Sequence, residues 1–342
     1  MLERGGRGNG KVRLLSAGLA AALAAAISSA APLNIPPRPA SCPERWLGLL
    51  GRYTAPGGAS LLATEKDGAL QLHDGGYRPL VETGQDSFHV ADTLALFARD
   101  SLGRGEVLLL GTRRYARSFI PGERGERPVA VWRQRNDSLW TAAKAAKLPR
   151  EKGRFAAPDL VEIRSIEPGI KTALLGRDSA AGGGAPVYRR AWLQRPAARA
   201  LARAHRRLAP LGYGIHVSDA YRPWYITKYL RLAAPPEQRR FYADPNVGSH
   251  HNRGTTVDVT LYELADGNEA DMGYAQDELS ERAAAFYPGG TSLQRWHRTV
   301  LRTALAAEGF RGLRKEWWHF RHIGQRPYRL MNVGLDELGR RP

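Results

Sequence analysis

The sequence of 342 residues contains a single cysteine, Cys42, so no disulfide bond can form within the chain. Any metal site must therefore be built from histidine, aspartate and glutamate side chains. Lysine is also scarce, because only eight of the 51 basic residues are lysine. The arginines are scattered and lack the interleaved aromatic residues typical of a nucleic-acid interface. The net charge of +18 thus reflects either a general preference for arginine or a surface suited to an anionic polymer, and nucleic acid is not expected as a partner.

Long hydrophobic runs are absent except for one near the N-terminus. The run LLSAGLAAALAAAISSAA spans 14–31, follows four basic residues and ends in small side chains. This layout is typical of a secretory signal peptide, which we place at 1–31; a membrane anchor is the alternative, but the run is short and rich in alanine. No later segment is apolar enough to span a bilayer. We therefore expect an exported protein, periplasmic or secreted, without a membrane span after cleavage.

The first third of the remaining chain has a β pattern. Residues 32–45 are rich in proline and indicate a linker. In the segment 46–120, KDG at 66–68 predicts a hairpin turn, and 94–111 predicts two strands around a glycine-containing turn. We predict a small all-β accessory domain here, barrel- or sheet-like. A linker region at 121–157, with a short helix near 139–147, follows it.

The segment 158–342 mixes helices and strands. An edge strand is expected within 157–166, further strands at 213–223 and 255–261, and helices at 195–212 and 291–310. The first of these helices should place His205 on its solvated side and end at Gly212. Because βαβ units do not repeat, this pattern favours an α+β fold over a doubly wound sheet.

The first motif with metal-binding chemistry is GSHHNRGTTVDVT, at 248–260. His250 and His251 stand side by side, and Asp258 follows on a short β-branched run. Imidazole nitrogen and carboxylate oxygen together suit a divalent metal such as zinc. Adjacent residues seldom both reach one ion, and spacing alone leaves the two histidines equivalent. A histidine pair on a surface would explain the motif equally well.

The second motif, KEWWHFRH at 315–322, contains Glu316 and His319. His319 would complete a set of three protein ligands and leave one metal position open, as in catalytic zinc sites. Zinc lowers the pKa of water to about 7, and Glu316 would then be the general base. An amphipathic core strand with an exposed glutamate is the alternative. Residues three apart face opposite sides of a regular strand, so both can reach one ion only if the strand is irregular.

The third motif is SDAYRPW, at 218–224. It places Arg222 at the end of a predicted strand, just before Pro223 turns the chain. A guanidinium there could donate hydrogen bonds to an oxyanion that forms during hydrolysis. An arginine bound to a carbonyl at a strand end would account for the motif without any catalytic role.

These motifs, in this order, resemble the zinc D-alanyl-D-alanine dipeptidases, which share a fold with the hedgehog signalling domain. DMG at 271–273 and the helix ending in EGF before EWWHF extend the resemblance over about 155–330. It implies a hedgehog-like zinc peptidase domain with a central antiparallel sheet. The family pattern S-x-H-x-x-G-x-x-x-D selects one histidine, so the implied ligands of one zinc ion are His251, Asp258 and His319.

The resemblance implies roles for four more residues. Glu316 takes the position of the catalytic base and Arg222 that of the arginine that stabilises the transition state, while Ser249 and Asp271 would lie near the amino end of the substrate. The implied activity is hydrolysis of D-Ala-D-Ala or a similar D,D-dipeptide, linked to peptidoglycan and D-alanine metabolism. A D,D-carboxypeptidase or endopeptidase acting on peptidoglycan stem peptides is the alternative, and an anionic cell-wall polymer would suit the positive charge.

The sequence departs from the family at three points. Thr256 replaces a small residue, the loop AAGGGAP at 180–186 is poor in aromatic and asparagine residues, and the β segment lies outside the family's minimal form. The loop leaves the details of the substrate open. A non-catalytic zinc-binding module is a further alternative, although such a module would need neither Glu316 nor Arg222.

Overall fold

A computed structural model describes residues 31–119, 136–173, 190–276, 278, 280–324 and 327–339. The predicted signal peptide, apart from Ala31, and the glycine-rich loop at 180–186 lie outside the described residues. Among the helices in the described ranges, none combines the length and the hydropathy needed to cross a membrane.

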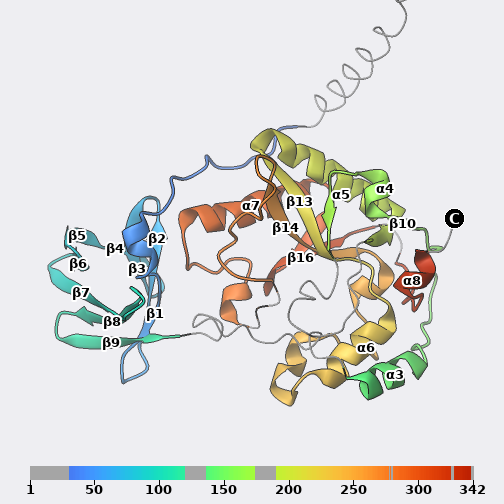
Figure 1. The fold of residues 1–342 in the computed structure, drawn as a ribbon, viewed down its shortest axis with the longest axis horizontal. Coiled ribbons are helices and arrows are strands. Elements are labelled where there is room, and N and C mark those ends of the chain that lie inside the picture. The colour runs from blue at the N-terminus through green and yellow to red at the C-terminus, as the bar shows by residue number, and fades with distance from the viewer. Residues whose placement is uncertain are drawn as a thin grey trace, which may run out of the picture. The chain divides into compact units, whose positions relative to one another are not determined.

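The β pattern of the first part is confirmed by a sheet of nine antiparallel strands (Figure 1). Its order is β4-β3-β2-β1-β9-β8-β7-β6-β5, so the two edge strands are neighbours in sequence and the sheet nearly closes on itself. The strands are β1 Gly51–Thr54, β2 Ser60–Lys66, β3 Ala69–His73, β4 Tyr77–Pro79, β5 Val81–Gly84, β6 Ser87–Val90, β7 Thr93–Arg99, β8 Gly105–Leu110 and β9 Arg113–Ser118.

Local sequence explains the hairpins of this sheet. The predicted turn between β2 and β3 is present, with Asp67 at φ 54° and Gly68 at φ 80°. Two consecutive left-handed residues match the twist of the flanking strands, and Asp-Gly tolerates that backbone better than most pairs. In β3, Leu70 and Leu72 alternate with polar residues and are fully buried. The side chains of this face form the core of the sheet.

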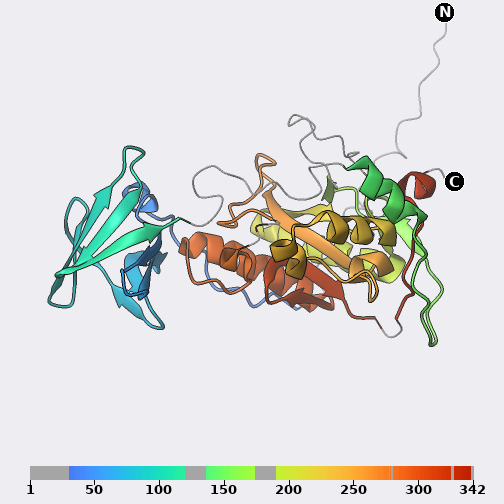
Figure 2. The same cartoon turned by 90° about the horizontal axis from the view of Figure 1, so that it is seen from below.

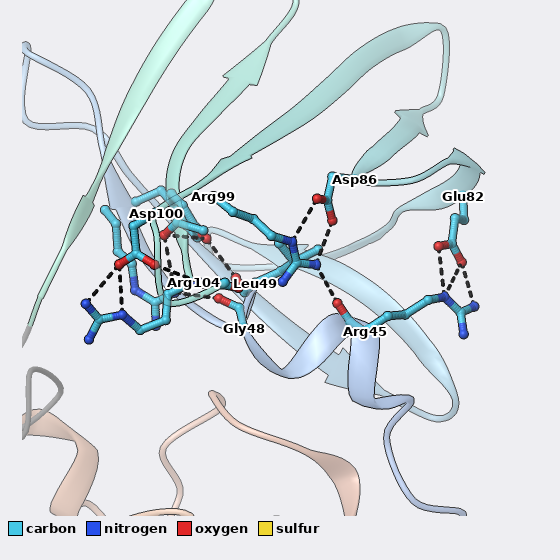
Figure 3. Close-up of polar contacts among 12 residues, drawn as sticks. Arg45, Gly48, Leu49, Glu82, Asp86, Arg99, Asp100 and Arg104 are labelled. Carbon is cyan, nitrogen blue, oxygen red and sulfur yellow. Dashed lines mark hydrogen bonds and ion pairs between the residues drawn. The ribbon is translucent and has the colours of Figure 1, made fainter.

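A short helix, α2 (Glu44–Leu47), is tied to the same sheet by one arginine (Figure 3). The Arg99 guanidinium donates to both carboxylate oxygens of Asp86, at 2.7 and 2.6 Å. It also donates to the carbonyl oxygens of Arg45 and Gly103, each at 2.6 Å. One side chain of β7 therefore contacts two turns and the helix. Whether this part is an independent domain stays a prediction.

The second part contains a five-stranded sheet of order β11-β13-β14-β16-β15 (Figure 1). The strands are β11 Lys171–Thr172, β13 Tyr213–Asp219, β14 Thr256–Glu263, β15 Phe310–Leu313 and β16 Glu316–His322. The predicted antiparallel pairing holds for four strands, but the two-residue edge strand β11 runs parallel to β13. The kinship with the hedgehog fold stays a prediction.

Helices α5 (Arg195–Leu208) and α7 (Ser292–Ala307) pack against each other and against this sheet (Figures 1 and 2). Both were predicted. Helix α7 begins with a capping box in which Thr291 and Gln294 exchange side-chain and backbone hydrogen bonds. The other helices are α3 Asp137–Ala145, α4 Ile163–Ile166, α6 Trp224–Ala233 and α8 Leu335–Leu338, with 3₁₀ turns η3 Ala209–Leu211, η4 Pro236–Phe241, η5 His250–Arg253 and η6 Glu281–Ala283.

One local prediction holds only in part, and a second is wrong. The expected edge strand within 157–166 is only three residues long, β10 (Leu160–Glu162), which pairs with β12 (Trp192–Gln194) before the chain turns into α4. The change from strand to helix occurs at Ile163, which is fully buried. His205 is 7% exposed rather than solvated, and its Nδ1 accepts a hydrogen bond from the backbone N–H of Ile215 at 3.1 Å. The α5 surface that looks polar in sequence is therefore covered by β13.

Candidate metal centre and active site

Three side chains from separate elements converge at one end of the five-stranded sheet. His251 lies in η5, Asp258 in β14 and His319 in β16, where the last two are directly opposite each other in the strand register. Asp258 Oδ1 lies 3.0 Å from His319 Nδ1 and 3.4 Å from His251 Nε2. The two imidazole nitrogens are 3.4 Å apart. The cross-strand pair thus brings together two groups that are 61 positions apart in the numbering.

The choice between the two adjacent histidines is made by the turn η5. The turn starts at Ser249 and ends at Gly254, whose φ of 68° is left-handed. A Cβ on that glycine would meet Leu160 Cδ2 at 2.7 Å, so the tight turn also depends on the missing side chain. The turn buries His251, which is 2% exposed, and leaves His250 at the surface, 2.9 Å from Arg321 Nη1.

The hydrogen bonding of His251 leaves one ring nitrogen available to a metal. Its Nδ1 lies 2.8 Å from the carbonyl oxygen of Ala220, so Nδ1 carries the hydrogen and Nε2 presents a lone pair to Asp258 and His319. A backbone carbonyl that fixes the tautomer in this way is a usual partner of metal-ligating histidines. The nearby imidazoles lower the pKa of Asp258 although burial opposes this.

The three groups fit a divalent cation. Asp258 Oδ1 is buried and receives no hydrogen bond of good geometry, which leaves a charged acceptor unsatisfied. The donor atoms of the trio all lie within 4.8 Å of one another. Two imidazole nitrogens and one carboxylate oxygen suit zinc, and three protein ligands leave room for further coordination.

The irregular strand expected from the spacing of Glu316 and His319 is present. In the pairing of β15 with β16, Gly312 opposes Phe320, but the next residue, Leu313, opposes Glu316. Three residues of β16 therefore bulge out of register. Because of this bulge, Glu316 Oε2 comes within 3.6 Å of His319 Nδ1. Burial, and then the Asp258 carboxylate, raises the pKa of Glu316.

Arg222 reaches the same site from the end of β13. Its backbone N–H donates to the carbonyl oxygen of His251 at 3.2 Å, and its carbonyl oxygen accepts from Asn252 Nδ2 at 2.8 Å. Its Nη1 lies 3.0 Å from Asp219 Oδ2, while Nε is buried without a hydrogen-bond partner. Residues 219–222 are thus fixed to the turn that carries His251. Asp219 was missed in the sequence, although it stands three residues before Arg222 in DAYR.

The two predicted substrate residues are placed differently. Ser249 caps η5, and its Oγ accepts a hydrogen bond from the backbone N–H of His251 at 3.3 Å. The Asp271 carboxylate accepts from the Gly273 N–H at 2.7 Å and from Gln294 Nε2 at 2.8 Å. Those bonds lead toward α7 and not to the His251–Asp258–His319 trio. Their roles in substrate binding stay predictions.

Comparison with known proteins agrees with the motifs. Residues 177–333 match the family model described as D-ala-D-ala dipeptidase. A D-alanyl-D-alanine dipeptidase of Escherichia coli strain K12 is 34% identical over 164 residues, which cover 47% of this chain and 83% of that protein. Proteins of the same name from Enterococcus faecalis and Streptomyces coelicolor are 35% and 37% identical, over 38% and 35% of this chain and 72% and 68% of theirs. The chain belongs to the D-alanyl-D-alanine dipeptidase family.

Proposed function

We propose that this protein is a zinc-dependent D,D-dipeptidase that hydrolyses D-Ala-D-Ala or a similar short D,D-peptide. The single observation that carries the proposal is the His251–Asp258–His319 trio, in which His251 is buried, with the Glu316 carboxylate beside it. A structural zinc site is normally closed by four protein ligands and needs no neighbouring base. The family membership supports the same reaction class.

The proposed chemistry assigns each residue a task. His251, Asp258 and His319 would hold zinc, which supplies a Lewis acid and lowers the pKa of water. Glu316 takes a proton from the water molecule whose oxygen adds to the peptide carbonyl carbon, and it delivers that proton to the nitrogen as the C–N bond breaks. Arg222 donates hydrogen bonds to the carbonyl oxygen while that oxygen is negatively charged. One water is consumed, and two amino acids leave.

The raised pKa of Glu316 is consistent with this task. A carboxylate with an ordinary pKa would be a weak proton acceptor near neutral pH, because its affinity for the proton of water is low. Burial and the nearby Asp258 charge strengthen its affinity for the proton. The arrangement therefore supports a proton shuttle better than a passive ion pair.

We further propose that the reaction takes place outside the cytoplasm, in the periplasm or in the secreted fraction. The support is the basic and apolar N-terminal sequence, which has the layout of a secretory signal. There, the activity would release D-alanine from wall-derived dipeptides.

A second function is favoured by two features of the chain. The nine-stranded sheet and the net charge of +18 lie beyond what a minimal dipeptidase needs, and the family match begins only at residue 177. Both features would suit a D,D-carboxypeptidase or endopeptidase that works on anionic peptidoglycan.

The discriminating experiment compares two substrates with the purified, zinc-loaded chain. Release of D-alanine is measured from free D-Ala-D-Ala and from a stem pentapeptide that ends in the same two residues. A dipeptidase has the higher kcat/KM on the free dipeptide. Turnover of the pentapeptide alone would replace the dipeptidase proposal with the carboxypeptidase.

A further inference from the structure

We propose that Asp219 is a positioning residue that orients the Arg222 guanidinium toward the reacting carbonyl group. The inference rests on the proposed function and assigns a task to a residue that the motifs left without one. Asp219 is 6% exposed, and its carboxylate does not belong to the metal-binding trio.

A register shift puts Asp219 in this place. Val217 of β13 opposes Val259, but Asp219, two residues further on, opposes Asp258. A regular antiparallel pairing would place Asp219 opposite Val257. The irregularity at Ser218 therefore brings a second buried carboxylate next to the metal-binding carboxylate.

The His251 ring lies between these two carboxylates. Its Nε2 is 3.4 Å from Asp258 Oδ1, and its Nδ1 is 3.7 Å from Asp219 Oδ2. The Nδ1–H group donates its hydrogen bond to the Ala220 carbonyl oxygen at 2.8 Å. Asp219 is therefore a neighbour of the ring and not its hydrogen-bond acceptor. The tautomer of His251 is thus fixed without Asp219, and the direct partner of Asp219 is a different residue.

That partner is Arg222. Asp219 Oδ1 accepts a hydrogen bond from the backbone N–H of Ala220 at 2.8 Å, which fixes the orientation of the carboxylate. Oδ2 then faces Arg222 Nη1 at 3.0 Å. Among the described residues, the Asp219–Arg222 ion pair is the contact that holds the guanidinium, because Arg222 Nε is buried and has no hydrogen-bond partner. A planar guanidinium can present its remaining N–H groups to an oxyanion only when one edge is held.

Electrostatics explain why the carboxylate is tolerated there. Two buried carboxylates on opposing residues repel each other unless each has its own cation. Arg222 neutralises Asp219, and the metal would neutralise Asp258. The pairing also keeps Asp219 from competing for the metal, so the two carboxylates have separate tasks.

The test uses Asp219→Asn, which keeps the shape and the Oδ1 acceptor but removes the charge that holds Arg222. We expect kcat to fall by about 10- to 100-fold, the range seen when a supporting partner is lost, with KM nearly unchanged. Affinity for a phosphinate analogue of the dipeptide, which mimics the tetrahedral oxyanion, should fall by the same factor. Zinc affinity, measured by competition with a chelator, should stay at the parent value.

A double-mutant cycle separates positioning from a general structural effect. In an Arg222→Ala background, Asp219→Asn should cause little further loss of kcat, because the group through which it acts is gone. The matched control is Glu269→Gln, since Glu269 pairs with His216 on the same strand at 2.7 Å but away from the site. That variant should keep parent kinetics. If Asp219→Asn does not fold, Asp219→Glu, which lengthens the carboxylate, is expected to lower kcat without raising KM.

Three results would overturn the inference. They are an Asp219→Asn enzyme with parent kcat, a loss that adds fully to that of Arg222→Ala, or a loss matched by weaker zinc binding. A parent chain inactive on every D,D-peptide would instead refute the proposed function. The inference on Asp219 would then be judged by the phosphinate and zinc affinities alone.

Discussion

Replacing each of the two adjacent histidines separately tests the whole register of the metal site. His251→Ala removes the proposed buried ligand and the hydrogen bond to the Ala220 carbonyl, whereas His250→Ala removes a surface side chain. An unsatisfied buried carbonyl costs about 1–3 kcal/mol, so metal-free His251→Ala should be less stable than the parent by that amount. His250→Ala should change the stability by less than about 0.5 kcal/mol.

Zinc should make the difference in stability between the two variants larger. At a free zinc concentration 1,000 times the Kd, binding to the native state alone adds about 4.1 kcal/mol of stability. With about 2–4 °C per kcal/mol for a domain of 150–250 residues, the parent Tm should rise by about 8–16 °C. His250→Ala should keep this rise and His251→Ala should lose it.

The assay is thermal denaturation of the full chain with and without zinc, together with metal analysis after gel filtration. Parent and His250→Ala should retain about one zinc per chain, which is the stoichiometry that one trio predicts. If His251→Ala kept the zinc-dependent rise in Tm and His250→Ala lost it, the assignment of the trio would be wrong. Removal of the metal by a chelator should reverse the zinc-dependent rise in the Tm of the parent.

Three further predictions concern catalysis, pH and packing. Glu316→Gln should lower kcat by about 10²- to 10⁴-fold with zinc content unchanged, and parent-like turnover would remove Glu316 as the base. Burial lowers the pKa of His205, so its neutral form contributes stability that is present above about pH 6.5 and lost as the pH falls. His205→Gln should therefore show a shallower loss of Tm on acidification, and an unchanged slope would contradict this. Gly214→Ala should cost about 1–3 kcal/mol in urea denaturation, since its Cβ would lie 2.3 Å from Tyr262 Cζ; a neutral effect would show that the ring moves freely.

Much of the local structure was predictable because its causes are local. The Asp67–Gly68 pair specifies a hairpin turn through the backbone angles it tolerates, and Thr291 specifies the start of α7 through its capping box. The strand around Asp258 follows from β-branched alternation. None of these needs a distant partner. The wrong prediction for His205 and the shorter extent of β10 both occur where a neighbouring element decides which side chains are buried.

The sequence by itself determined the residue types of the site and, with the family resemblance, which histidine to choose. It could not determine that the Glu316 and His319 side chains lie 3.6 Å apart, because the pairing of β16 with β15 creates the three-residue bulge that brings them together. Nor could it reveal Asp219, whose place opposite Asp258 depends on a register shift between strands about 40 residues apart in sequence. Strand register is a property of two segments at once, so the proposed ligands could be predicted from the sequence, whereas the contacts that support them were decided by the tertiary structure.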